Sequence, residues 1–73
     1  MEDVIKWYTE RGCTHVQTLG FVKMPDGYAL MINSDYTHYF WVREDWAESS
    51  ITCDRWDAYR GALRDSKERT SCN

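Results

Sequence analysis

Two segments of the chain, residues 28–32 and 36–42, are apolar at nearly every position. A strand with one face in solvent alternates apolar and polar residues, and these two segments hardly do. The pattern predicts two adjacent strands that are apolar on both faces. Because 73 residues provide little material for covering two faces of a sheet, we expect one face to pack on the protein's own helices and the other to be available to a partner.

The segment before these strands predicts a third strand and a tight hairpin. Residues 14–24 are rich in Val, Thr and Phe, which favours an extended strand. Pro25 suits the second position of a type I turn and Gly27 the left-handed position that follows, which is typical of a three-residue hairpin loop with a bulge. This hairpin would pair Val22 with Leu30.

A second turn is predicted at residues 33–35. A loop of two or four residues there would pair Leu30 with Tyr39, whereas a three-residue loop would exchange the two faces of the last strand. We expect the even loop. The face that we assign to the main core then carries Val22, Met24, Tyr28, Leu30, Ile32, Tyr39 and Trp41. The opposite face carries Leu19, Phe21, Met31, His38, Phe40 and Val42.

A short helix is predicted before the strands, over residues 2–11. Its apolar face consists of Val4, Ile5 and Tyr8, joined by Trp7. Acidic residues occupy its first turn, where the helix dipole favours them. Gly12 follows the last helical residue and suits the C-cap.

A second helix is predicted after the strands, from Cys53 to about Ser66, with Thr52 as its N-cap. Gly61 weakens the interior of this helix by about 1 kcal/mol relative to Ala, which indicates a role in close packing on the sheet. Residues 67–73 contain no apolar residue except Cys72, and we expect them to form a disordered polar tail.

These elements predict an α+β fold in one compact domain over residues 1–66. An N-terminal helix precedes a three-stranded antiparallel meander, and a C-terminal helix packs on the sheet. The sequence leaves two arrangements open. Both helices could share one face and leave the other exposed, or each helix could cover one face and leave no large apolar patch.

Charge and targeting signals narrow the class of protein. The net charge is −3, and the excess of acid lies in Glu44, Asp45, Glu48, Asp54 and Asp57. Nucleic-acid binders need a basic footprint, so direct nucleic-acid binding is disfavoured. No apolar run approaches the roughly 20 residues that span a bilayer. The first residues lack the features of a signal peptide, and the odd count of three cysteines indicates reduced thiols, so we expect a cytoplasmic protein.

Three kinds of chemistry have candidate residues, and none has a strong pattern. Cys13, His15, His38 and Cys53 are possible zinc ligands, but the expected register places the two histidines roughly 20 Å apart. Cys13 and Cys53 could be nucleophiles only beside an orienting base, and packing is the simpler role. Asp54 and Asp57 suit the helix dipole better than acid–base catalysis. We therefore expect no metal, no cofactor and no enzymatic activity.

Partner binding is the function that remains. Tyr, Trp and Met are enriched at the centres of interfaces, and aromatic residues make up 15% of the chain. An edge strand at residues 14–21 would also be usable. The residues we expect to contact a partner are Phe21, Met31, His38, Phe40, Glu44, Asp45 and Glu48.

The function predicted first is a small acidic domain that occupies a surface of another protein, with a basic surface as the favoured target. Phage- or plasmid-borne inhibitors of host proteins are a familiar example of such domains. The alternative is a small homodimeric regulatory or structural subunit without catalytic activity, because a self-complementary patch would give a two-fold dimer.

Overall fold

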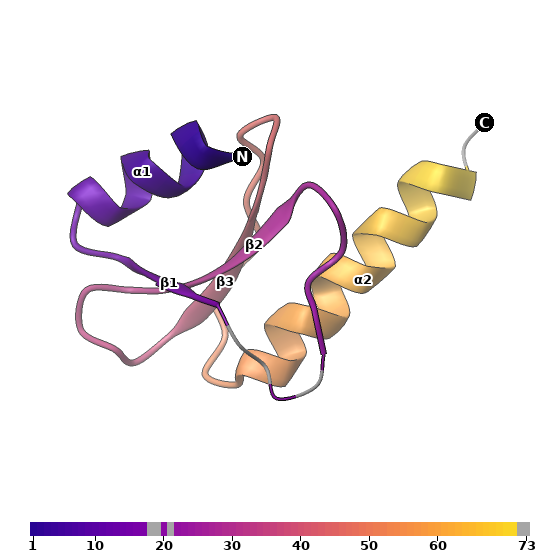
Figure 1. Cartoon of the computed structure of the whole chain (residues 1–73). Helices are drawn as coiled ribbons and strands as arrows, with labels where there is room; N and C mark the ends of the chain where they lie inside the picture. The colour runs from indigo at the N-terminus through magenta and orange to yellow at the C-terminus, as the bar shows by residue number, and fades with distance from the viewer. Residues whose placement is uncertain (18–19, 21, 72–73) are drawn as a thin grey trace.

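The computed structural model describes residues 1–17, 20 and 22–71 (Figure 1). It confirms the predicted α+β fold, with a helix, a three-stranded antiparallel sheet in the order β1-β2-β3, and a C-terminal helix against the sheet. The elements are α1 (Glu2–Glu10), β1 (Thr14–Val16), β2 (Tyr28–Ile32), β3 (Tyr39–Arg43) and α2 (Arg55–Ser71).

Each helix covers one face of the sheet, which selects the second of the two arrangements left open by the sequence (Figure 1). Under α1, Val4 packs in one cluster with Met31, Phe40 and other residues of the same face. The side chains of Met31 and Phe40 are 0% and 7% exposed. Both were candidates for an open partner-binding face, and the structure places both in the core.

The opposite face of the sheet packs against α2. Leu30 lies against Ala58, and Trp41 lies with Ala62. Gly61 allows this close approach, since a Cβ atom there would lie 3.1 Å from Nε1 of Trp41. The close-packing role predicted for this glycine is therefore confirmed.

The turn between β2 and β3 has an even length, as predicted, but the register differs by two residues. Leu30 pairs with Trp41, where Tyr39 was expected. A hydrogen bond from the N–H of Asn33 to the carbonyl of His38 closes a four-residue turn at residues 34–37. The Asn33 side chain accepts two further backbone N–H bonds from the far end of this turn, which stabilises the later position. A shift of two residues keeps every side chain on its predicted face.

The hairpin predicted before β2 was wrong. Val16, and not Val22, pairs with Leu30. The strand β1 contains only three residues, Thr14–Val16. Residues 25–28 do form a turn, but Pro25 occupies its first position, because its carbonyl accepts the N–H of Tyr28 at 3.1 Å. The predicted partners Leu19 and Phe21 lie outside the described residues.

Side-chain packing explains how the apolar residues before β2 serve the core without a strand ladder. Val22 and Met24 are half-buried and still pack against the α2 side of the sheet. They thus reach their predicted face from an irregular segment. The positive φ predicted for Gly27 is present at +84°.

The C-terminal cap of α1 was predicted correctly, whereas the start of α2 was not. Gly12, with φ +97°, donates to the carbonyl of Thr9, and Cys13 donates to that of Tyr8, which together form a Schellman C-cap of α1. The predicted cap at Gly12 is therefore confirmed, and the helix itself ends at Glu10, one residue earlier than predicted. The second helix begins two residues later than predicted, and its N-cap is Asp54 instead of Thr52. The Asp54 carboxylate accepts the N–H of Trp56 at 2.9 Å.

The end of α2 at Ser66 was also predicted wrongly, because the helix continues to Ser71. Residues 67–69 are good helix formers, and Figure 1 shows that these last turns project beyond the sheet. A lack of apolar residues therefore marks where packing ends and not where the helix ends.

The chain that follows β3 protects its outer edge. Glu48 bridges to Val42 and Thr52 bridges to Tyr39, so residues 48–52 run antiparallel to β3. Ser49 adds a hydrogen bond to the carbonyl of Trp41 at 3.0 Å. This return segment fixes the acidic residues 44–48 beside the N-terminal helix.

Candidate protein-binding surface

The most exposed aromatic contact in the described structure joins α1 to the loop after β3. The indole rings of Trp7 and Trp46 meet edge to face, with centroids 6.1 Å apart and planes at 85°. The two residues are 41% and 50% exposed. Together with the neighbouring Tyr8, Arg11 and Glu48 they form what we call the tryptophan surface.

The backbone of Trp46 is held in an unusual conformation. Its φ is +74°, in the left-handed region, which costs a non-glycine residue about 1 kcal/mol or more. Two hydrogen bonds stabilise this turn, from Trp46 N–H to the Arg43 carbonyl at 2.9 Å and from Arg43 N–H to the Ala47 carbonyl at 2.8 Å. The fold thus holds a strained residue in place although its ring is half in solvent. Such strain is concentrated at functional positions in proteins.

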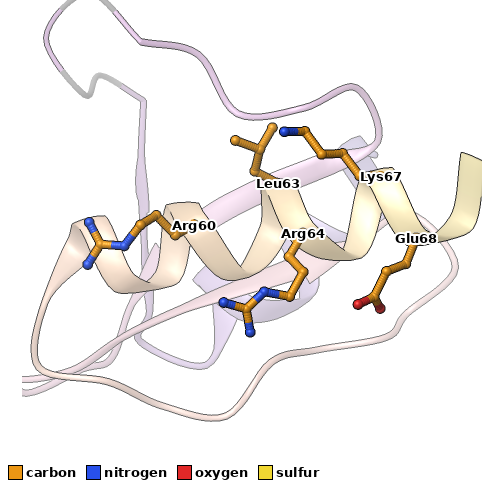
Figure 2. A pocket seen from close by; sticks show the side chains of 5 residues that line it. All are labelled: Arg60, Leu63, Arg64, Lys67 and Glu68. Atoms are coloured by element: carbon orange, nitrogen blue, oxygen red, sulfur yellow. The ribbon is translucent and has the colours of Figure 1, made fainter.

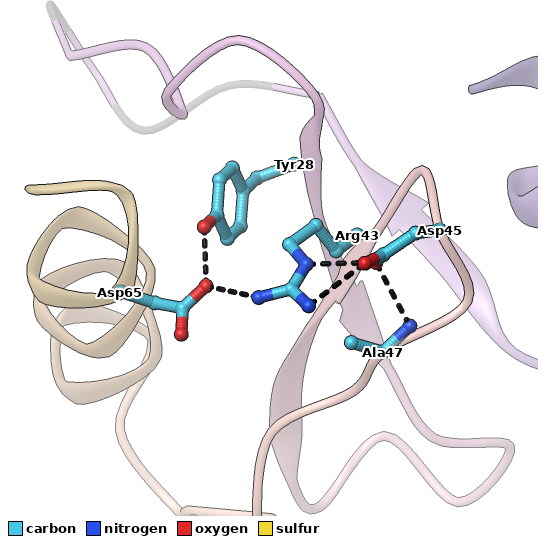
Figure 3. A network of polar contacts seen from close by, with 5 residues as sticks. All are labelled: Tyr28, Arg43, Asp45, Ala47 and Asp65. Atoms are coloured by element: carbon cyan, nitrogen blue, oxygen red, sulfur yellow. Dashed lines mark hydrogen bonds and ion pairs between the residues drawn. The ribbon is translucent and has the colours of Figure 1, made fainter. Parts of the chain in front are cut away.

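A polar network anchors this turn to α2 (Figure 3). The Arg43 guanidinium donates to both carboxylate oxygens of Asp45, at 2.7 and 2.8 Å, and to Asp65 at 2.6 Å. Tyr28 also donates its hydroxyl proton to Asp65, and Asp45 accepts the backbone N–H of Ala47 at 3.3 Å. The loop that presents Trp46 is therefore tied to both the sheet and the helix.

The ionisation of this network follows from its hydrogen bonds. Hydrogen bonds from the Arg43 side chain lower the pKa of Asp45 from 3.8 to about 2. For Asp65, the hydrogen bond from Tyr28 is the largest influence and lowers the pKa, with Arg43 adding to it. The same carboxylates raise the pKa of Arg43. All three groups are charged at neutral pH, so the turn is held by ionic hydrogen bonds.

Tyr8 connects the aromatic residues to an acid. Its ring contacts Trp7 at a centroid distance of 4.9 Å and Phe40 at 5.5 Å. Its hydroxyl donates to Oε2 of Glu48 at 2.6 Å. Burial first, and then the bond to Glu48, raise the pKa of Tyr8 to about 12. The hydroxyl therefore stays protonated and holds one carboxylate oxygen of Glu48 within the tryptophan surface.

Arg11 places a cation on the same surface. Its guanidinium carbon lies 3.6 Å from the centre of the Trp7 ring, and it donates to the Trp7 carbonyl at 2.9 Å. A guanidinium at this distance over the ring makes a cation–π contact, for which Trp is the best aromatic partner. The surface therefore already contains one example of arginine recognition within the chain itself.

The residues predicted from the sequence are separated by the structure. Glu44, Asp45 and Glu48 are exposed; Glu48 belongs to the tryptophan surface, and Glu44 and Asp45 lie next to Trp46 along the loop after β3. His38 is half-buried in the turn at the other end of β3, with Nδ1 2.9 Å from Oγ1 of Thr37. Met31 and Phe40 are buried, and Phe21 lies outside the described residues.

Trp7 and Trp46 were not predicted as contact residues. Trp7 was assigned to the buried face of the first helix, because helical spacing does not distinguish a covered ring from one at the rim of the face. The signal available for Trp46 was its place inside the acidic segment 44–48. Only the left-handed turn shows that its ring is presented outward beside Trp7.

A second surface, with the opposite charge, lies along α2. Arg60, Arg64, Lys67, Leu63 and Glu68 line an open groove of about 290 Å³ (Figure 2). Figure 2 shows that all five side chains come from α2, with the guanidinium of Arg64 extending away from the helix. Arg60 forms an ion pair with Asp57 on the same helix. The lining comes from long side chains on one helix, so this groove lacks the rigid framework that the Arg43 network provides for Trp46.

The thiols and histidines show no assembled site within the described part of the chain. No group of three or more His, Cys, Asp or Glu side chains in residues 1–17, 20 and 22–71 could hold a metal ion. Burial raises the pKa of the Cys13 thiol, which lowers its nucleophilicity at neutral pH, and burial lowers the pKa of His15. Among the described helices, none has the length and apolar character to cross a membrane.

Comparisons with protein-family models, curated proteins and solved structures found no match to this chain. The functional proposal therefore depends on the geometry of the chain itself.

Proposed function

We propose that this chain is a protein-binding domain that acts by covering a basic surface of another protein with its tryptophan surface. The main support is Trp46, whose half-exposed ring is held in a strained backbone conformation by an ionic network. Neither the exposed ring nor the positive φ is needed to close the core. Trp is the residue type most enriched among the energetic centres of interfaces.

Charge around the rings indicates the kind of partner. Glu44 and Glu48 are exposed on either side of Trp46 in the sequence, and neither forms an ion pair in the described residues. Carboxylates around an aromatic centre attract a basic partner and exclude an acidic one. A domain of this size that covers a basic functional surface in the cytoplasm would act as an inhibitor, in the manner of phage- or plasmid-borne inhibitors of host proteins.

The test compares two tryptophans in matched surroundings. Trp46→Ala removes a ring of the tryptophan surface, whereas Trp56→Ala removes a ring that is 39% exposed and meets Tyr59 edge to face at the same 6.1 Å. Proteins retained by immobilised wild-type chain from a cell lysate are compared with those retained by each variant. We expect Trp46→Ala to lose the retained partner and Trp56→Ala to keep it. Equal retention by both variants would contradict the proposal.

Charge reversal provides an independent arm of the test. Glu44→Lys combined with Glu48→Lys should weaken retention of the partner, because both residues are exposed and flank Trp46 in the loop after β3. Asp45 is left unchanged, since its loss would break the Arg43 network and disturb the turn itself. Asp35→Lys, at the opposite end of β3, makes a single-site control for a change in net charge, and unchanged retention is expected.

A further inference from the structure

We infer that the exposed ring of Trp46 is the docking site for an arginine side chain of the partner, with Glu48 as its counter-ion. This inference rests on the proposed function and specifies its chemistry. It assigns to Trp46 the role that Trp7 already has toward Arg11. The occupant is therefore an arginine-containing basic segment of a protein.

Trp7 and Arg11 provide an example within the chain of an indole that binds a guanidinium. Arg11 stacks on Trp7 at 3.6 Å, so one ring of the pair already has its cation. No described arginine or lysine stacks on Trp46, whose ring is the more exposed of the two. The two indoles form one edge-to-face contact, and of the two only Trp7 has a described guanidinium over its ring. The unoccupied member of such a pair is suited to the same group from another chain.

The carboxylate of Glu48 provides a negative charge for an incoming cation. Glu48 uses Oε2 to accept the Tyr8 hydroxyl, and its other oxygen makes no hydrogen bond with any described residue. Tyr8 contacts Trp7, and Trp7 contacts Trp46, so the hydrogen bond from Tyr8 ties this carboxylate to the residues that hold the ring pair. Asp45 differs, because Arg43 already pairs with both of its oxygens. Glu48 is thus a fixed carboxylate with a free oxygen for an incoming cation.

The chemistry of the surface favours an arginine side chain over a lysine side chain and over nucleic acid as the ligand of Trp46. A guanidinium is planar and weakly hydrated, so it can stack on an indole and donate to a carboxylate at the same time, whereas an ammonium group is strongly hydrated. A phosphate backbone would be repelled by Glu44 and Glu48. The groove along α2 has basic residues and cannot serve the same ligand.

The test uses a short peptide of alternating glycine and arginine, with the same peptide containing citrulline, the neutral isostere of arginine, as the control. The chain has four tryptophans, so its indole N–H groups give four NMR signals that substitution can assign. We expect the arginine peptide to shift the Trp46 and Trp7 signals and to leave Trp56 nearly unchanged. Equal shifts with the citrulline peptide, or larger shifts at Trp56, would overturn the inference.

Substitutions measure the two contacts separately. Trp46→Ala should weaken binding of the arginine peptide about threefold to fivefold, as expected for one exposed cation–π contact. Glu48→Gln should weaken it, whereas Asp35→Asn, which also removes one negative charge, should not. A lysine peptide that bound as tightly as the arginine peptide would contradict the guanidinium assignment.

Arg11→Gln provides a test that misfolding cannot imitate. It removes the internal guanidinium and one positive charge next to the ring pair, so we expect tighter binding of the arginine peptide by about twofold or more. Weaker binding would overturn the inference. If the arginine peptide fails to bind while Trp46→Ala still loses the protein partner, the inference fails and the proposed function stands. If Trp46→Ala keeps the partner, the proposed function itself fails.

Discussion

Among single residues, positive φ angles occur both at turn glycines and at exposed aromatic residues. Gly12 and Gly27 have positive φ where a helix cap and a turn require it. Trp46 has a positive φ of +74° although an indole gains nothing from that conformation locally. Tyr36, which is 66% exposed in the turn before β3, also has a positive φ of +58°. Trp46 differs from Tyr36 in its ring contact with Trp7 and in the Arg43 network that holds its turn.

A matched pair of variants tests the strain at Trp46. Trp46→Gly and Trp46→Ala remove the same ring, but only glycine adopts φ +74° without a steric penalty. We therefore expect Trp46→Gly to be more stable than Trp46→Ala by about 1 kcal/mol in urea unfolding. Equal stabilities would show that the turn relaxes in the variants and that the wild-type backbone stores no strain.

At Gly61, helix propensity and close packing against Trp41 have opposite effects on stability. Gly61→Ala should gain about 1 kcal/mol from helix propensity. The new Cβ would lie 3.1 Å from the indole nitrogen of Trp41, which is buried against Tyr28 at a ring distance of 5.2 Å and has little room to move. We expect overpacking to outweigh the gain, so that the free energy of unfolding falls by about 1 kcal/mol. A rise in stability would show that Trp41 can shift.

At the scale of elements, the start of α2 distinguishes the predicted cap from the observed one. Asp54→Ala should lower the free energy of unfolding by about 1 kcal/mol, because the carboxylate accepts the N–H of Trp56 in the first turn. Thr52→Ala should have a smaller effect, since its hydroxyl makes only long contacts of 3.4 and 3.5 Å. The reverse order, measured by urea unfolding, would restore Thr52 as the cap.

The link between the loop after β3 and α2 should make stability depend on pH. The pKa of Asp45 falls from 3.8 to about 2 on folding, so its contribution is complete above pH 3.8 and is lost as pH falls toward 2. Asp65 has its pKa lowered in the same direction. We expect the wild-type chain to lose stability over this range more steeply than Asp45→Asn, measured by thermal unfolding at several pH values. Parallel curves would mean that the carboxylate of Asp45 is not paired with Arg43 in solution.

At the scale of the whole molecule, the placement of the helices determines what surface remains. With one helix on each face and the return segment 48–52 along β3, the large apolar residues of the sheet are covered. The exposed apolar residues are single or paired, among them Ile51, Trp56 and the Trp7–Trp46 pair. A surface of this kind suits a compact contact with a partner better than an extensive permanent interface.

This coverage leads to a prediction about the oligomeric state. We expect a monomer with the chain mass of 8.7 kDa at micromolar concentration, measured by light scattering. A particle of twice that mass would support the alternative homodimeric subunit. In that case Trp46→Ala and Trp56→Ala would show which exposed rings lie in the self-interface.

The sequence by itself determined the order of the elements and the face of each strand residue. Period-2 and period-3.6 patterns are local, so they identified α1, β2, β3 and the start of α2 to within a few residues. The faces survived a register shift of two residues, because side-chain direction in a strand depends only on parity. The glycine at the end of α1 and the acidic segment 44–48 were also visible in the sequence.

Contacts between residues distant in sequence set the pairing of β1, the side of the sheet that each helix covers, and the exposed position of the Trp46 ring. Val16 and Val22 have similar strand propensity, and contacts distant in sequence select which of them faces Leu30. The assignment of Met31 and Phe40 to the core depends on α1 crossing to that face. The tryptophan surface depends on residues 7 and 46 meeting across 6.1 Å, and no local pattern encodes such a contact between separate elements.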